Sequence, residues 1–308
     1  MLAKINVHHY IDIGVNLLYY VLGRTDLRIS PFAMRDNAYA EIQRKYDKFD
    51  VDWNSAPRIS DVWFGWLWPV GNNGPYESPQ QVLTYLHSVK EDKELDADVE
   101  KLVAIVGSLM PDYLQHWTDI QKEVNATVQS LLESFPTDEI LSKNEKIAHR
   151  KYESAEAFFY YNLLRTQTAQ SWEHNGKSIY IVGLDYLRDI EGFAGFMAHE
   201  LRHILINQSG IFNREDILAL IQRIHPLTKD WQDSSEVGCI IENMNFVLDA
   251  WSEKGNNAEL PDIRSFRRRE EDKVIAKAFY DNQQILMDRS FEEFVEVSLK
   301  ELVTKHGI

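Results

Sequence analysis

The chain has 308 residues, of which 44% are hydrophobic and 12% aromatic, enough to build one large folded domain or two modest ones. Its formal net charge is −15, and such an acidic chain repels the phosphate groups of nucleic acids and of anionic membranes. We therefore expect neither a nucleic acid nor a membrane to be its main partner.

Cys239 is the only cysteine, which excludes an internal disulfide bond. Residues 1–9 lack the charged and then apolar pattern of a signal peptide. The chain also has no apolar run of about 18 residues that would span a membrane. These features predict a cytoplasmic protein, and they leave its oligomeric state open.

Residues 1–150 are predicted to form a helical N-terminal region, with its first helices over 7–23 and 31–48. Proline and glycine interrupt the aromatic segment 51–76, which we expect to be a long loop held to the body by its tryptophans. An aromatic wall of a binding groove is the alternative. The later helices of this region are expected to begin at Ser78, Asp96, Pro111 and Thr137, the last as a cap.

The pattern changes to that of a small sheet between residues 156 and 184. Asn175-Gly176 separates two apolar runs and favours a hairpin, because a type I′ turn needs positive φ at both central positions. The strand that follows is predicted to contain Ile179, Tyr180, Ile181 and Val182. Its edge could bind an extended peptide, or the sheet could simply cap a helical body. The fold class is therefore mainly α with a small β-sheet (α+β).

The next segment contains a His-Glu-x-x-His array, formed by His199, Glu200 and His203, in a predicted helix that ends at Gly210. Residues four apart lie one above the other on a helix, so both imidazoles can reach one metal ion. Tetrahedral zinc binds imidazole nitrogen and leaves room for a third ligand and a water. Glu200 can accept a proton from that water.

The two faces of this helix predict its surroundings. The histidines lie almost opposite an apolar stripe, and Phe196 and Ile206 flank them, so we expect a helix between a core and a cleft. Arg202 lies between the two histidines, where metallopeptidase arrays usually have uncharged residues. A chance pattern of hydrogen-bonded histidines is the alternative.

A third ligand is expected from the helix predicted over residues 230–253. We prefer Glu236, whose long side chain starts at the edge of the apolar stripe, and place Asp233, within the stripe, second. Glu242 ranks third because it points away from the stripe and is expected to face solvent. All three could instead be helix-start or solvated acids.

The remaining segments are also predicted to be helical. A short helix capped by Asn213 and Asp216 should run to Ile224, where His225-Pro226 interrupts it. Two closing helices are expected over 263–288 and 291–305, with Ser290 capping the last.

Over roughly 156–253 the chain resembles the zincin metallopeptidases, in particular the gluzincins, which combine His-Glu-x-x-His with a glutamate on a following helix. The resemblance implies a zincin-like metallohydrolase domain over 151–308, with one Zn²⁺ per chain held by His199, His203 and Glu236. It also implies Glu200 as general base and a strand near 179–182 that aligns the substrate.

The expected reaction is hydrolysis of a peptide bond in a peptide or protein substrate. The oxyanion of the reaction needs a donor, and His225 and Tyr280 are candidates because both follow the array in sequence. A non-catalytic helical binding or scaffold protein with a degenerate zincin-like fold is the first alternative. A zinc hydrolase of a non-peptide amide is the second.

Overall fold

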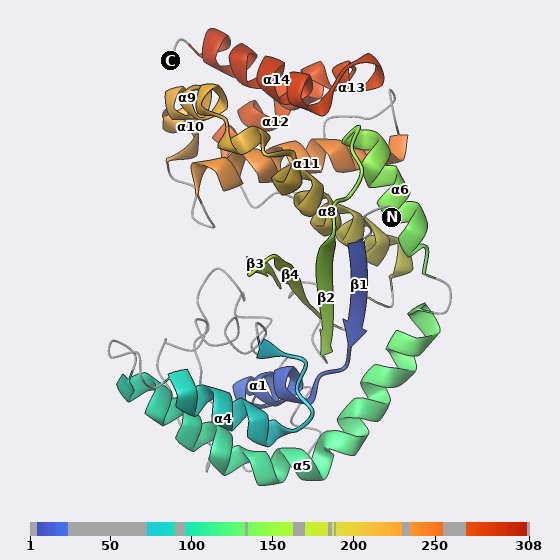
Figure 1. The fold of residues 1–308 in the computed structure, drawn as a ribbon, viewed down its shortest axis with the longest axis vertical. Coiled ribbons are helices and arrows are strands. Elements are labelled where there is room, and N and C mark those ends of the chain that lie inside the picture. The colour runs from blue at the N-terminus through green and yellow to red at the C-terminus, as the bar shows by residue number, and fades with distance from the viewer. Residues whose placement is uncertain are drawn as a thin grey trace. The chain divides into compact units, whose positions relative to one another are not determined.

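The computed structural model describes residues 5–23, 73–89, 96–132, 135–162, 170–183, 187, 189–229, 235–254 and 269–306. The described part is mostly helical and contains one small sheet, as the sequence predicts (Figure 1). Two compact units divide the chain. The sheet unit consists of Asn6–Phe135 and Glu156–Ile190, and the helical unit of Met1–Ile5, Pro136–Ala155 and Glu191–Ile308.

The sheet unit contains four strands in the spatial order β1-β2-β4-β3. Their bounds are Ile5–Tyr10 for β1, Ala155–Asn162 for β2, Gln170–His174 for β3 and Lys177–Gly183 for β4. Strands β2 and β4 are parallel, whereas β3 and β4 are antiparallel neighbours. Between β3 and β4, φ is 49° at Asn175 and 73° at Gly176, which confirms the predicted hairpin turn.

The prediction that Ile179–Val182 offers a sheet edge is wrong. These four residues lie in β4, which is paired with β2 on one side and with β3 on the other. All four are buried, with at most 3% of their surface exposed. A continuous apolar run is typical of a strand covered on both faces, whereas a strand with one solvated face shows alternation. In the described sheet the edges are β1 and β3.

The helix predicted over 7–23 is a strand followed by a shorter helix. Strand β1 ends at Tyr10, and α1 runs over Ile13–Gly23. Asp12 separates them, and its Oδ1 accepts a hydrogen bond of 2.7 Å from the amide of Val15. An aspartate at this position starts a helix, and the aromatic and β-branched residues before it favour a strand.

Two further helices belong to the described part of the sheet unit, α4 over Pro79–Val89 and the longer α5 over Asp96–Leu132. Pro111 does not begin a separate helix as predicted, since it lies inside α5, which is visibly bowed (Figure 1). A proline removes one hydrogen bond of a helix, and a bend accommodates it. The helix predicted over 31–48 and residues 51–72 of the aromatic segment lie outside the described residues.

Helices make up the described part of the helical unit. Their bounds are Thr137–Ile147 (α6), Ile190–Ser209 (α8), Glu215–Arg223 (α9), His225–Thr228 (α10), Glu236–Lys254 (α11), Glu270–Asn282 (α12), Ile285–Asp288 (α13) and Phe291–Lys305 (α14), with a 3₁₀ turn, η2, at Ile211–Asn213. Helix α12 lies between α11 and α14 (Figure 1). In all the described ranges, no helix is sufficiently long and apolar to cross a membrane.

Two predicted helix ends of this unit are confirmed. Helix α8 stops before Gly210, which has a left-handed φ of 66°. Ser290 caps α14 by accepting a hydrogen bond of 3.1 Å from the amide of Glu293. Both signals are local, because a left-handed residue or a side-chain oxygen acts within one helical turn.

Two other predicted caps are wrong. Thr137 is the first residue of α6 and not its cap, a position held by Pro136 without a side-chain hydrogen bond. Helix α9 begins after Arg214, because η2 occupies Asn213. Asp216 lies inside α9, where it pairs with Arg214. Capping residues are common in loops, so their presence alone does not fix a helix boundary.

The hydrophobic core of the helical unit surrounds one side of α11. Cys239, Ile240, Met244, Val247 and Leu248 of this helix are completely buried there. They belong to one cluster with apolar residues of α9, α12 and α14. The opposite side of α11 carries polar residues and forms the site described below.

Candidate metal centre

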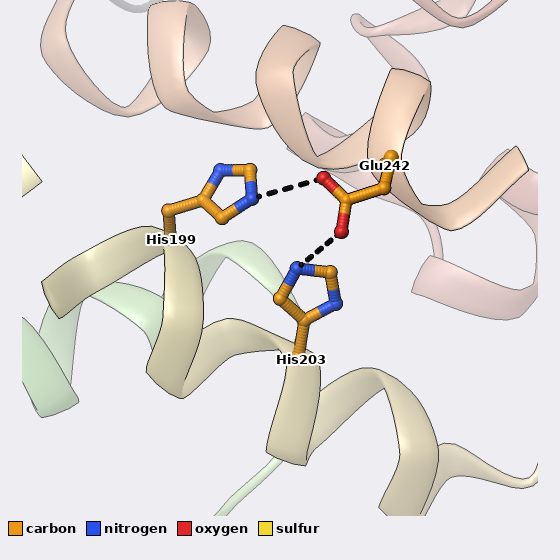
Figure 2. Close-up of side chains that lie close together, drawn as sticks. All are labelled: His199, His203 and Glu242. Carbon is orange, nitrogen blue, oxygen red and sulfur yellow. Dashed lines mark ion pairs between the residues drawn. The ribbon is translucent and has the colours of Figure 1, made fainter. Parts of the chain in front are cut away.

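Helices α8 and α11 bring three metal-binding side chains together (Figure 2). His199 and His203 project from successive turns of α8, and Glu242 points towards both from α11. Nε2 of His199 lies 3.4 Å from Oε2 of Glu242, and Nε2 of His203 lies 3.3 Å from Oε1. Among the described residues, these form the group whose ligand atoms all lie within 4.8 Å of one another.

Two of the distances between these ligand atoms match those of a tetrahedral zinc site. With metal–ligand bonds of about 2.1 Å, two ligand atoms of such a site are about 3.4 Å apart. The two observed nitrogen–oxygen distances, 3.4 and 3.3 Å, agree with this separation. Charge-assisted hydrogen bonds are shorter, at about 2.7–2.9 Å. Two imidazoles and one carboxylate are also a ligand set that leaves a fourth position open in catalytic zinc sites.

The structure corrects the preferred third ligand from Glu236 to Glu242. Glu236 lies at the first turn of α11, where its carboxylate contacts Nδ1 of His225. Asp233 lies outside the described residues. Glu242 does point away from the apolar stripe, as predicted, but that face of α11 meets the histidines of α8 and keeps only a third of the Glu242 side chain, 34%, exposed.

Both predicted oxyanion donors contact residues other than the three metal-binding side chains. His225 is exposed on α10 and forms its ion pair with Glu236. Tyr280 lies on α12 and packs against the hydrophobic core. Glu200, the predicted general base, follows His199 on α8 and is half-buried. Its role as general base stays a prediction.

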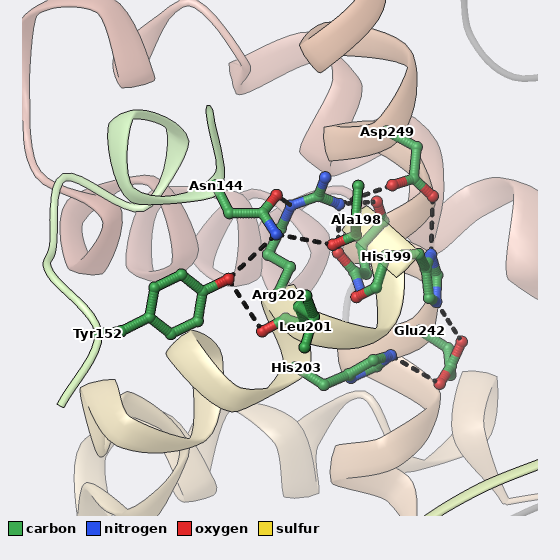
Figure 3. Close-up of polar contacts among 10 residues, drawn as sticks. Asn144, Tyr152, Ala198, His199, Leu201, Arg202, His203, Glu242 and Asp249 are labelled. Carbon is green, nitrogen blue, oxygen red and sulfur yellow. Dashed lines mark hydrogen bonds and ion pairs between the residues drawn. The ribbon is translucent and has the colours of Figure 1, made fainter. Parts of the chain in front are cut away.

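A second layer of polar residues holds His199 from behind (Figure 3). Nδ1 of His199 lies 2.7 Å from Oδ2 of Asp249, which is two turns beyond Glu242 on α11. A carboxylate only accepts hydrogen bonds, so Nδ1 carries the hydrogen. The neutral imidazole then has its lone pair on Nε2, the atom that faces Glu242. The tautomer that Asp249 selects is the one that a metal needs.

The same contacts control the charges of the site. Burial alone would lower the pKa of His199, but the carboxylates of Asp249 and Glu242 raise it well above its ordinary value. Burial would raise the pKa of Glu242, but His203 and His199 hold it far below its usual range. A metal ion that binds Nε2 of His199 must therefore displace a proton that the two carboxylates favour.

Arg202, the unusual residue of the array, points away from the metal-binding atoms. It is completely buried, with 0% of its surface exposed. Its Nη1 donates to Oδ1 of Asp249 at 2.7 Å and to Oδ1 of Asn245 at 2.6 Å, and its Nε donates to Oδ1 of Asn144 at 3.2 Å. A charged residue between the histidines is thus compatible with a metal site, because it belongs to the layer behind it.

Three side chains attach to the backbone of the same helical turn (Figure 3). Asn245 donates to the carbonyl of His199 at 2.9 Å, Asn144 to that of Ala198 at 2.8 Å, and Tyr152 to that of Leu201 at 3.2 Å. A carbonyl oxygen has two lone pairs and can accept a second bond beside the one within the helix. These bonds fix the turn that carries His199.

The sequence contains a signal for Glu242, which our prediction ranked third, and for Asn245 and Asp249, which it missed. Glu242, Asn245 and Asp249 recur at helical spacing on the face of α11 opposite its apolar stripe. A solvated face usually mixes both signs of charge, yet no Lys or Arg occurs between Glu236 and Glu253. Phe246, on the same face, packs against His199 with the two rings tilted by 48° and their centroids 4.7 Å apart. An acidic stripe of this kind indicates cationic partners on another helix.

Comparisons of this chain with models of protein families, with curated proteins and with solved structures find no match. The chemistry of the site is therefore inferred from its donor atoms and their geometry.

Proposed function

We propose that this chain is a zinc-dependent hydrolase of the gluzincin type, acting on peptide bonds. His199, His203 and Glu242 would hold one Zn²⁺, and Glu200 would act as general base. The observation that carries the proposal is the convergence of the two Nε2 atoms on the carboxylate of Glu242, at 3.4 and 3.3 Å. These distances between ligand atoms suit a tetrahedral zinc ion.

A zinc ion at this position supplies Lewis acidity, which acidifies water and polarises a carbonyl group. Glu200 accepts the proton of the attacking water and then delivers it to the leaving nitrogen. Asp249 keeps His199 in the tautomer that leaves Nε2 available, through the bond of 2.7 Å to Nδ1. Glu200 is half-buried, so its carboxylate keeps access to water.

A non-catalytic scaffold is the second candidate, and one observation favours it. The two carboxylates of the centre already have protein partners, since Glu242 pairs with both histidines and Asp249 pairs with His199 and Arg202. Such a closed set of ion pairs can stabilise two packed helices without a metal. The two candidates differ in metal content and in turnover.

The test begins with elemental analysis of the purified protein, wild type beside His203→Ala. The hydrolase requires about one zinc per chain in the wild type and its loss in the variant. Glu200→Gln should then keep the zinc and lose cleavage of a peptide library, because an amide cannot accept the proton. Glu191→Gln, at an exposed position on the same helix, is the matched control and should retain both.

Three outcomes would contradict the proposal. Wild-type protein without zinc after reconstitution would leave the scaffold as the better description. Zinc without cleavage of any peptide in the library would also favour the scaffold. Full activity of Glu200→Gln would refute the assigned general base while keeping the metal site.

A further inference from the structure

Arg202 is the least expected residue of the metal-binding helix, and its contacts connect it to His199 by two routes. One route runs through Asp249, whose Oδ1 accepts from Nη1 of Arg202 at 2.7 Å and whose Oδ2 lies 2.7 Å from Nδ1 of His199. The other runs through Asn245, which accepts from Nη1 at 2.6 Å and donates to the carbonyl of His199 at 2.9 Å. The first route reaches the ring and the second reaches the backbone.

The two carboxylate oxygens of Asp249 bind different partners, Arg202 and His199. An Arg–Asp pair that serves only to neutralise a buried charge is commonly bidentate, with two parallel N–H···O bonds. Here Arg202 takes one oxygen and His199 takes the other. Within the described residues, Nη2 of Arg202 has no hydrogen-bond partner. The carboxylate is thus shared with the imidazole at the expense of a second bond to the guanidinium.

A carboxylate with only one of these two partners could rotate about its side-chain torsions. Arg202 has no such freedom, because it is completely buried and its Nε is held by Asn144 at 3.2 Å. The guanidinium is therefore a fixed point from which Asp249 is aligned on His199. This is the role that outer-layer partners have at metal sites, where they orient a ligand and set its tautomer.

We propose that Arg202 is a positioning residue of the metal centre. It holds Asp249 against Nδ1 of His199 and so directs Nε2 of that ring towards the metal position. This role rests on the proposed zinc site and adds to it a residue within the array that binds neither metal nor substrate.

The experiment measures zinc affinity by competition with a chelator, on protein whose fold is checked by near-UV circular dichroism. Arg202→Met should weaken zinc binding roughly 10–100-fold, the usual effect of removing an outer-layer partner. Arg202→Lys keeps the charge without the planar fork, so its loss should be smaller, and it carries the test if Arg202→Met does not fold. Arg214→Met removes another paired arginine, on the surface, and should bind zinc like the wild type.

A double-mutant cycle separates positioning from general stability. Asp249→Asn alone should weaken zinc binding, and adding Arg202→Met to it should cause less loss than Arg202→Met causes in the wild type, because the proposed alignment of the His199 ring runs through Asp249. A purely structural Arg202 predicts independent losses that multiply. A readout without metal complements the cycle: the Nδ1 proton of His199 should exchange slowly in the wild type and faster in Arg202→Met and Arg202→Lys.

The results distinguish this inference from the proposed function. Zinc binding by the wild type with unchanged affinity in folded Arg202→Met or, if that fails to fold, in Arg202→Lys would overturn the positioning role alone. Losses that multiply in the cycle would do the same. Wild-type protein that binds no zinc would overturn both proposals.

Discussion

Zinc should stabilise the helical unit through Glu242 and not through Glu236. Both are acids of α11, and the sequence favours the wrong one, so Glu236→Gln and Glu242→Gln form a matched pair of variants. Each replacement keeps the length of the side chain and removes one negative charge. The structure predicts that only the second variant loses the metal, because the carboxylate of Glu242 lies 3.4 and 3.3 Å from the two Nε2 atoms.

The size of the effect follows from the linkage between binding and folding. At a free zinc concentration of about 100 times Kd, binding to the folded state alone adds about 2.7 kcal/mol to the free energy of unfolding. The helical unit has about 140 residues, and a domain of roughly this size gains about 2–4 °C in Tm per kcal/mol. Zinc should therefore raise the Tm of the wild type and of Glu236→Gln by roughly 5–11 °C.

The assay is thermal unfolding in metal-free buffer, with zinc and then with an excess of chelator. Glu242→Gln should show no rise with zinc. Without metal its Tm should also be lower than that of the wild type, because the two histidines that hold the pKa of Glu242 below its usual range lose their partner, so the assay compares the change in Tm with zinc within each variant. If zinc raised the Tm of Glu242→Gln and left the Tm of Glu236→Gln unchanged, the assignment of the third ligand would be refuted. Absence of a rise in the wild type would refute the metal site itself.

Three further predictions concern pH, the core and one helix end. Burial raises the pKa of Asp249, but His199 and Arg202 outweigh it and hold that pKa below its ordinary value. The ionised Asp249 therefore stabilises the fold above the unfolded-state pKa of about 3.9, and this stabilisation is lost as the pH falls through the lower folded-state pKa. Urea unfolding between about pH 2 and pH 7 should show that the free energy of unfolding falls less with acid in Asp249→Asn than in the wild type. Ile240→Ala should lower the free energy of unfolding by about 2–5 kcal/mol, because the side chain is completely buried, and an unchanged urea midpoint would contradict that packing. Gly210→Ala should lower the free energy of unfolding by about 1–2 kcal/mol because of the left-handed φ of 66° alone, as a Cβ at this position meets no atom within 4 Å. Gly210→Asn should lower it less in the same urea titration, because asparagine adopts this conformation more readily.

The parts of the fold that could be predicted are those that a few neighbouring residues determine. Asn175-Gly176 sets the turn of a hairpin, Gly210 ends α8, and Ser290 caps α14. In each case the competing conformations are excluded by sterics or by one hydrogen bond within a single turn. The His199–His203 pair belongs to the same group, because the helix period alone places both rings on one face.

The parts that could not be predicted depend on which surfaces meet. The position of Glu242 opposite the apolar stripe of α11 is visible in the sequence, but whether that face meets water or another helix is a property of the assembled unit. The sequence likewise suggests that β4 lies at an edge, and only the pairing with β2 and β3 places it inside the sheet. Pro111 shows the same dependence, since a proline that begins a helix in one context bends a longer one in another.

The cationic side chains of α8 and the acidic side chains of α11 face each other, which indicates that the centre does more than hold two helices together. Burying charge between α8 and α11 is costly, and apolar residues of similar size often give equal or better stability at such positions. The chain instead places Arg202, His199 and His203 against Asp249 and Glu242, with Arg202 completely buried. Local rules of sequence and packing are broken most often at functional sites.

The charges of the centre also suit a divalent cation. The carboxylates of Asp249 and Glu242 raise the pKa of His199, so they stabilise positive charge at this position. A zinc ion bound there would replace the proton on Nε2 of His199 and would present two positive charges to the same two carboxylates. Side chains arranged to stabilise one positive charge in this way therefore also suit a divalent cation.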